Sequence, residues 1–119
     1  MLKLAKAGAA AETDTALGAN EYTRHFHCPF AENGVVLYAL MGDFSSQTVT
    51  LQVSYDKGAN FATYYAKDPT GALAAVTYAA AANDCVYGPG QLFRFHCSNG
   101  GTPDIDIQVD GDVALLPKT

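Results

Sequence analysis

A stretch in the middle of the chain alternates strictly between apolar and polar side chains. Its apolar members are Val49, Leu51, Val53 and Tyr55, and its polar members are Thr48, Thr50, Gln52 and Ser54. A period of two predicts a β-strand with one apolar face and one hydroxyl-rich face. The residues that follow, 56–61, have the composition of a tight turn. The segment therefore predicts an antiparallel hairpin at the centre of an all-β domain.

Short segments of the same kind recur along the chain, with turn sequences between them. We expect further strands at 22–28, 35–41, 61–67, 72–78, 91–97, 104–110 and 113–116. The segment 35–41 is almost continuously apolar, which is typical of a strand covered on both faces. About eight strands with short connections, and no crossover long enough for a βαβ unit, predict an antiparallel β-sandwich that is jelly-roll-like.

Two further segments carry weaker expectations about side-chain placement. The alternation in 91–97 places Phe93, Phe95 and Cys97 on one face and Arg94 and His96 on the other. The run 79–83 is rich in alanine and fits either a helical turn or a loose edge.

The first twenty residues differ from the rest because they show no period and are rich in alanine. We expect residues 1–20 to form an extended N-terminal arm that becomes ordered only against another molecule. Leu2 and Leu4 are the candidate contact residues at its tip. Residues 21–119 then form a single β-sandwich domain, since 119 residues lie within the usual size range of one domain.

The net charge of the chain limits the classes of molecule that it is expected to bind. The net charge is −5, the isoelectric point is near 4.8, and only 16% of the residues are charged. Such a surface argues against nucleic acid, which is bound through Lys and Arg, and against an anionic membrane surface. No apolar run approaches the roughly 20 residues of a membrane-spanning helix. A low charge fraction suits a protein that lies against other proteins, or a modestly soluble monomer.

The chain has an odd number of cysteines, which predicts free thiols in a reducing compartment. They are Cys28, Cys85 and Cys97. His25, His27 and His96 could share a zinc ion if their strands were neighbours, but no paired Cys-x-x-Cys spacing accompanies them, so solvated or interface histidines are favoured. A Cys–His nucleophile pair lacks a third orienting group. A disulfide between Cys28 and Cys97 is disfavoured in a reducing compartment.

Four carboxylates alternate with apolar residues near the C-terminus. They are Asp104, Asp106, Asp110 and Asp112. Carboxylates at i and i+2 stand roughly 6–7 Å apart on one strand face, within reach of a shared calcium ion. A glycosidase would need a carboxylate pair across a groove. We favour a solvated acidic face that discourages edge pairing, and we therefore predict no catalytic, metal or cofactor site and no enzymatic activity.

The turn after the central strand carries the most specific motif. Ser54, Asp56, Gly58 and Phe61 match the Asp-box pattern Ser/Thr-x-Asp-x-Gly-x-x-aromatic. Asp56 can accept hydrogen bonds from turn amides, and Gly58 supplies a positive φ. Phe61 is expected to fold its ring onto the hairpin. This motif predicts a structural staple of the hairpin.

Two blocks of the sequence resemble small virion proteins of tailed bacteriophages. The block 44–61 reads FSSQTVTLQVSYDKGANF, and the block 87–95 reads YGPGQLFRF. The family shows a stretch like TVTLQ-S-DGG-TW and, about thirty residues further on, a PG--RF strand. The resemblance covers roughly residues 44–117. It departs from the family at Phe61, where Trp is usual, at Lys57–Gly58, which replaces Gly-Gly, and at 72–83, which has no clear counterpart.

The resemblance implies a β-sandwich that decorates the capsid or belongs to the tail, and it carries over no catalytic residues. We expect a capsid cement protein that binds the assembled shell, bridges capsomers as a homodimer or homotrimer, and has the major capsid protein as partner. It would be made in the host cytoplasm and reside on the virion. The alternatives are a tail-associated or receptor module that contacts a glycan through Tyr64 and Tyr65, and a small hydrolase or metal-dependent protein.

Overall fold

The computed structural model describes residues 4–5, 12–27, 35–87, 92–110 and 113–115. Within these ranges all regular secondary structure is β-strand, and every strand pair is antiparallel. The strands are β1 (Leu4–Ala5), β2 (Glu12–Leu17), β3 (Phe26–His27), β4 (Val35–Asp43), β5 (Val49–Ser54), β6 (Ala62–Thr63), β7 (Tyr65–Lys67), β8 (Leu73–Ala75), β9 (Thr77–Tyr78), β10 (Ala82–Tyr87), β11 (Leu92–Cys97), β12 (Asp104–Asp110) and β13 (Val113–Leu115).

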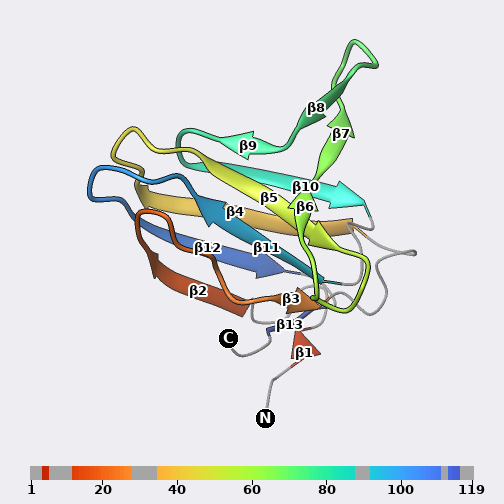
Figure 1. Cartoon of the computed structure of the whole chain (residues 1–119), viewed down its shortest axis with the longest axis horizontal. Helices are drawn as coiled ribbons and strands as arrows, with labels where there is room; N and C mark the ends of the chain where they lie inside the picture. Colours follow the sequence, from red (N-terminus) through yellow and green to blue (C-terminus); the bar gives the residue numbers. More distant parts are fainter. Residues whose placement is uncertain (1–3, 6–11, 28–34, 88–91, 111–112, 116–119) are drawn as a thin grey trace.

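These strands form two packed sheets and a separate hairpin. Sheet A has the order β1-β13-β3-β11-β5-β6, with β9 also paired to β5, and sheet B has the order β10-β4-β12-β2. Strands β7 and β8 pair only with each other and rise away from the two sheets (Figure 1). From β2 to β5, and again from β9 to β13, successive strands alternate between the sheets. The expected all-β, antiparallel, sandwich-like fold is confirmed.

A single hydrophobic core lies between the sheets. Its members are Leu17, Phe26, Val36, Tyr38, Leu40, Phe44, Val49, Leu51, Val53, Phe93, Phe95, Cys97, Ile105, Ile107 and Val109. At its centre the rings of Phe26 and Phe93 stack 5.2 Å apart, and Tyr38 meets Phe95 edge-on. The expected faces of β11 are confirmed, because Phe93, Phe95 and Cys97 point inward. Arg94 and His96, which alternate with them, are only partly buried on the outer face.

The central strand β5 follows its expected alternation until its last residues. Val49, Leu51 and Val53 are buried, but Tyr55, expected on the same face, is 69% exposed. Ser54 is buried instead. The alternation stops because the strand ends at Ser54, whose hydroxyl becomes the hydrogen-bonding centre of the following turn.

Strand β4 is covered on one face only, which corrects the expectation of cover on both faces. Val36, Tyr38 and Leu40 lie in the core, whereas Leu37 is 51% exposed and Met41 is 41% exposed. The apolar run therefore reflects a buried inner face and an open apolar outer face. Periodicity alone does not distinguish this arrangement from a fully covered strand.

The N-terminal segment is part of the sandwich from Glu12 onward, which corrects the expected boundary at residue 20. Strand β2 forms the edge of sheet B beside β12, and Leu17 at its end is 2% exposed. A shift in register on the β12 side, between Ile105 and Ile107, breaks the simple period. In β1, Leu4 pairs with Ala114 through the backbone. The other candidate arm residue, Leu2, lies outside the described residues.

The expected strand 22–28 is shorter than its sequence suggests. Of its described residues, 22–27, only Phe26–His27 is regular strand, and Tyr22 makes an isolated bridge to His96. Between them the buried Thr23 hydroxyl accepts a hydrogen bond from the Phe95 amide at 3.0 Å and donates to the Arg24 carbonyl. A side chain thus takes over one ladder bond, as Ser and Thr can do, and the backbone leaves regular strand geometry.

The two strands expected at 61–67 and 72–78 are each broken in two. Strands β6 and β9 both pair with β5, and between them Tyr64 donates its amide to the Leu51 carbonyl while Val76 accepts from the Leu51 amide. The chain leaves sheet A after Tyr64 and returns at Val76. The excursion 65–75 is the β7–β8 hairpin, which we call the finger.

The alanine-rich run 79–83 enters strand β10, which pairs with β4 along Ala82–Tyr87. Of the two alternatives left open by the sequence, the edge strand is therefore the one observed. Its low intrinsic β-propensity is overridden by pairing with a central strand.

Candidate functional site

The Asp-box residues form one hydrogen-bonded turn between β5 and β6. The Ser54 hydroxyl donates to Asp56 Oδ1 at 2.7 Å and accepts from the Gly58 amide at 2.8 Å. Asp56 also accepts from the Asn60 amide at 2.9 Å, through Oδ1, and from the Asn60 side chain at 2.8 Å, through Oδ2. The turn is thereby closed from both sides by side-chain oxygens.

The backbone of this turn explains why glycine stands at its corner. Lys57 and Gly58 both have positive φ, at 61° and 92°. A Cβ at Gly58 would lie 3.0 Å from the Leu92 side chain, so the turn packs directly onto sheet A. Hydrogen bonds from the Asn60 side chain, the Asn60 amide and Ser54 lower the pKa of Asp56 to about 2.

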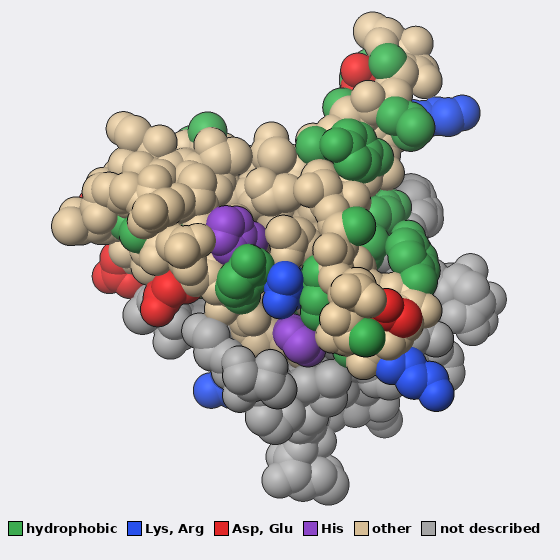
Figure 2. Space-filling model, viewed as in Figure 1, with side chains coloured by type: hydrophobic (Ala, Val, Ile, Leu, Met, Phe, Trp, Pro, Cys, Tyr) green, Lys and Arg blue, Asp and Glu red, His purple; other side chains and the backbone are tan. Residues whose placement is uncertain are grey.

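The turn delivers Phe61 onto the outer face of sheet A, where five side chains stack in a row. The Arg94 guanidinium lies between two rings, 3.8 Å from the centroid of Tyr22 and 4.0 Å from that of Phe61. The His96 ring lies 4.4 Å from the Tyr22 ring with their planes tilted by 37°, and the His25 ring lies 4.7 Å from the Phe61 ring with a tilt of 50°. We call this row the Arg94 stack. Figure 2 shows both histidine side chains in purple on one face, with basic and hydrophobic side chains between them.

Polar neighbours fix the ends and the centre of the stack. Arg94 donates through Nε to Gln52 Oε1 at 2.8 Å, and Nε2 of His96 lies 3.1 Å from Asn20 Oδ1. Gln52 faces Arg94 directly across the β11–β5 pair. Among the described residues no carboxylate pairs with Arg94, and its partners there are the Tyr22 ring, the Phe61 ring and Gln52.

Arg94 is the positively charged member of the stack at neutral pH. Burial, followed by the charge of Arg94, lowers the pKa of both His25 and His96 below the ordinary value of 6.5. Burial also lowers the pKa of Arg94, but a guanidinium keeps its proton in proteins. The two histidines are therefore neutral at pH 7 and frame a single positive charge.

This arrangement bears on the metal and nucleophile alternatives. His25 and His96 lie at opposite ends of the Arg94 stack, and the side chain of His27 is outside the described part. No group of three or more His, Cys, Asp or Glu side chains that could hold a metal ion occurs among the described residues. Cys97 is buried and forms no disulfide, and burial raises the pKa of its thiol. Cys85 is exposed, whereas Cys28 lies outside the described residues.

The acidic residues of β12 follow the alternation expected for them. Ile105, Ile107 and Val109 are buried, while Asp104 is exposed and Asp106 is partly exposed. Asp104 faces Asp43 across the β12–β4 pair, and Asp106 faces Met41. Nothing is described for the side chain of Asp110 or for Asp112.

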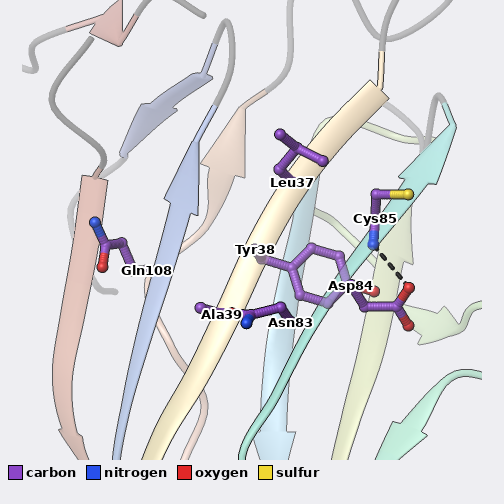
Figure 3. A pocket seen from close by; sticks show the side chains of 7 residues that line it. All are labelled: Leu37, Tyr38, Ala39, Asn83, Asp84, Cys85 and Gln108. Carbon is purple, nitrogen blue, oxygen red and sulfur yellow. Dashed lines mark hydrogen bonds between the residues drawn. The ribbon is translucent and has the colours of Figure 1, made fainter. Parts of the chain in front are cut away.

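The outer face of sheet B contains a shallow hollow of about 600 Å³. Its walls come from β4, β10 and β12, as Figure 3 shows, and they consist of Leu37, Tyr38, Ala39, Asn83, Asp84, Cys85 and Gln108. Beneath it, the Tyr38 hydroxyl bonds to the Tyr78 hydroxyl, which donates to Asp84 at 2.7 Å. This chain of hydroxyls ties β9 of sheet A to β10 of sheet B.

The two surface tyrosines expected to contact a ligand differ in exposure. Tyr65 is 56% exposed on the finger, together with Leu73 at 68%, whereas Tyr64 packs against the core. At the tip, Asp68 accepts bonds from the amides of Thr70 and Ala72 and so holds the turn closed.

Sequence reasoning missed the Arg94 stack, although it placed Arg94 and His96 on one outer face. Tyr22 and Phe61 come from distant segments, and only the Tyr22–His96 bridge and the Asp-box turn bring them to Arg94. The Asp-box motif was the available signal, because its aromatic residue had to cover a neighbouring strand.

No protein-family model matches the chain, and no curated protein matches it in sequence. In the described ranges no helix is long and apolar enough to cross a membrane.

Proposed function

We propose that the protein is a capsid decoration protein of a tailed bacteriophage, which binds the assembled shell and bridges its subunits. The observation that carries the proposal is the finger, an isolated hairpin that presents Tyr65 and Leu73 to solvent. A two-stranded hairpin is marginally stable by itself in water. One that exposes large apolar side chains away from the core suits contact with another protein.

Two further features support a virion role. The strand orders β10-β4-β12-β2 and β1-β13-β3-β11-β5-β6, with strands that alternate between the two sheets, support a jelly-roll arrangement. Jelly rolls recur in viral capsid and lectin domains. The two blocks that resemble phage virion proteins correspond to β5 with its turn and to β11, which pair side by side. On this proposal the chain acts as a homodimer or homotrimer on the capsid surface with the major capsid protein as partner. It stabilises the shell by mass action, since it binds only the assembled form.

Copy number tests the proposal directly. Quantitative mass spectrometry of purified particles should find this chain in a simple ratio to the major shell protein, at hundreds of copies on the scale of a symmetric shell. A handful of copies would instead assign it to the tail, and its absence from particles would refute a virion role.

Binding of the purified chain to undecorated shells tests the finger. Replacing Tyr65 and Leu73 by serine should weaken shell binding while the chain melts normally. Tyr55→Ser is the matched control, because Tyr55 is a similarly exposed tyrosine on another loop and its loss should leave binding unchanged. Equal losses in both variants would contradict a role for the finger.

A tail-associated or receptor module that binds glycans is the second candidate. The Arg94 stack favours it, because it gathers guanidinium and imidazole groups, which can hydrogen-bond a sugar, on the outer face of sheet A. Retention of the isolated chain on glycan arrays, together with low copy number, would select this candidate over decoration.

A further inference from the structure

The Arg94 guanidinium contacts two aromatic rings and one side-chain amide. Its two flat faces are covered by Tyr22 and Phe61, at 3.8 and 4.0 Å. The Nε of Arg94 donates a hydrogen bond to Gln52. The described residues provide no other hydrogen bond to this side chain. Every buried side-chain nitrogen or oxygen in the described part of the chain has a partner. The two terminal nitrogens of Arg94 have no hydrogen-bond partner among the described residues, and the Arg94 side chain is only partly buried.

Arg94 is partly buried and has no counter-ion among the described residues, and burial of an unpaired charge costs free energy. Within the described part of the chain, no carboxylate forms an ion pair with Arg94. Burial and the Arg94 charge lower the pKa of His25 and His96, so both flanks are neutral near pH 7. The fixed cation is set in a protein of net charge −5. Its unpaired edge is thus a local site of positive charge on an acidic molecule.

We propose that the Arg94 stack is a binding site for a carboxylate group, held edge-on by the two terminal nitrogens of Arg94. Guanidinium and carboxylate are both planar and pair through two parallel N–H···O bonds. A phosphate can also pair with a guanidinium, so inorganic phosphate serves as the competing ligand in the test. The site goes beyond the decoration role, since nothing in that role requires it.

The side chains around Arg94 act as positioning residues in this site. The Asp-box turn fixes Phe61 on one face, the bridge to His96 fixes Tyr22 on the other, and Gln52 fixes the rotation of the guanidinium. Because the ring faces are already occupied within the stack, the site does not offer a free platform for stacking a sugar ring. Recognition must therefore come from the edge, where the carboxylate binds.

The carboxylate can come from an acidic protein side chain or from an acidic sugar, and NMR titration of the full chain distinguishes them. N-acetylglutamate amide and glucuronate serve as probes, with N-acetylglutamine amide and glucose as neutral analogues, all at constant ionic strength. The acids should cause saturable shifts at the Arg94 side chain and at the His25 and His96 rings, and the neutral analogues should not. Binding of only one acid identifies the source.

Variants of arginine complete the test. Arg94→Met should abolish the saturable shifts, whereas Arg24→Met, at an exposed arginine on a neighbouring segment, should retain them. Arg94→Lys keeps the charge but loses the planar fork and should bind about tenfold more weakly. It also serves if Arg94→Met does not fold. Equal shifts with neutral analogues, saturation by inorganic phosphate alone, no saturable shift, or unchanged binding by Arg94→Lys would each overturn the proposal.

Discussion

The outer faces of the two sheets differ in how far side chains of the same chain cover them. On sheet A, the Arg94 stack covers the strands with side chains that contact and hydrogen-bond one another. On sheet B, Leu37 and Met41 stand exposed along β4 beside a hollow of about 600 Å³. One face is completed by residues of its own chain, and the other leaves apolar surface in water. Mutations on the first face should therefore act on folding, and mutations on the second should leave folding almost unchanged.

The two described thiols give the largest expected contrast. Cys85 lines the open hollow, whereas Cys97 is fully buried between the sheets. In a Cys28→Ser variant, native-state alkylation with iodoacetamide should modify Cys85 on the order of a hundredfold faster than Cys97. Peptide mass spectrometry measures both rates in one sample. Comparable rates would mean that the hollow is covered or that the core opens readily.

Truncation of one apolar side chain on each face should separate their effects on stability. Phe61→Ala removes a ring that packs on both Arg94 and His25, and should lower the free energy of unfolding by about 1–2 kcal/mol. Leu37→Ala removes an exposed side chain and should change it by less than about 0.5 kcal/mol. Urea denaturation followed by circular dichroism gives both values. A larger loss for Leu37→Ala would reverse the comparison.

A double-mutant cycle asks whether the contacts of sheet A are energetically coupled. Arg94→Met and Tyr22→Leu, made singly and together, should show a coupling of about 0.5–1 kcal/mol, as expected for a cation over an aromatic ring. The same cycle with Leu37→Ala and Met41→Ala on sheet B should give a coupling near zero. Equal couplings on the two sheets would show that the contact between Arg94 and Tyr22 contributes no coupling energy of its own.

The smallest expected effect is a dependence of stability on pH that originates on sheet A. The pKa of both His25 and His96 is lowered in the folded state by burial and by Arg94. The unfolded chain therefore binds more protons, so stability should be constant above the ordinary pKa of 6.5 and should fall as the pH drops below it. A variant with His25→Gln and His96→Gln should show a shallower fall in urea denaturations between pH 7.5 and 5.5. An unchanged slope would assign the effect elsewhere.

The central strands of the sandwich were predictable from sequence, whereas the edges of sheet B were not. Strands β5, β11 and β12 each bury one face, and the period of two records that burial directly. Strands β2 and β10 lie at the two edges of sheet B. An edge strand needs pairing on one side only, and its sequence is less constrained. The segments 12–17 and 82–87 therefore carried little signal of strand structure.

The Asp-box turn and the Arg94 stack illustrate where local reasoning ends. The hydrogen bonds of Ser54, Asp56 and Gly58 join residues within four positions of one another, so the motif alone suggested them. The contacts of Arg94 with Tyr22 and Phe61 join three separate segments of the chain. They depend on the register of β11 and on the bridge at Tyr22, which no pattern in a single sequence specifies.

The finger lies between β6 and β9 in the chain, and both of these strands still pair with β5. Tyr64 and Val76, the residues at its base, both bond to Leu51 and also to each other, with the Val76 amide 3.0 Å from the Tyr64 carbonyl. The two ends of the finger are thus held together by hydrogen bonds within sheet A. We therefore expect that the segment 65–75 can be shortened, lengthened or replaced while β5 keeps its partners. A foreign peptide inserted at its tip would be displayed on a scaffold whose folding does not depend on it.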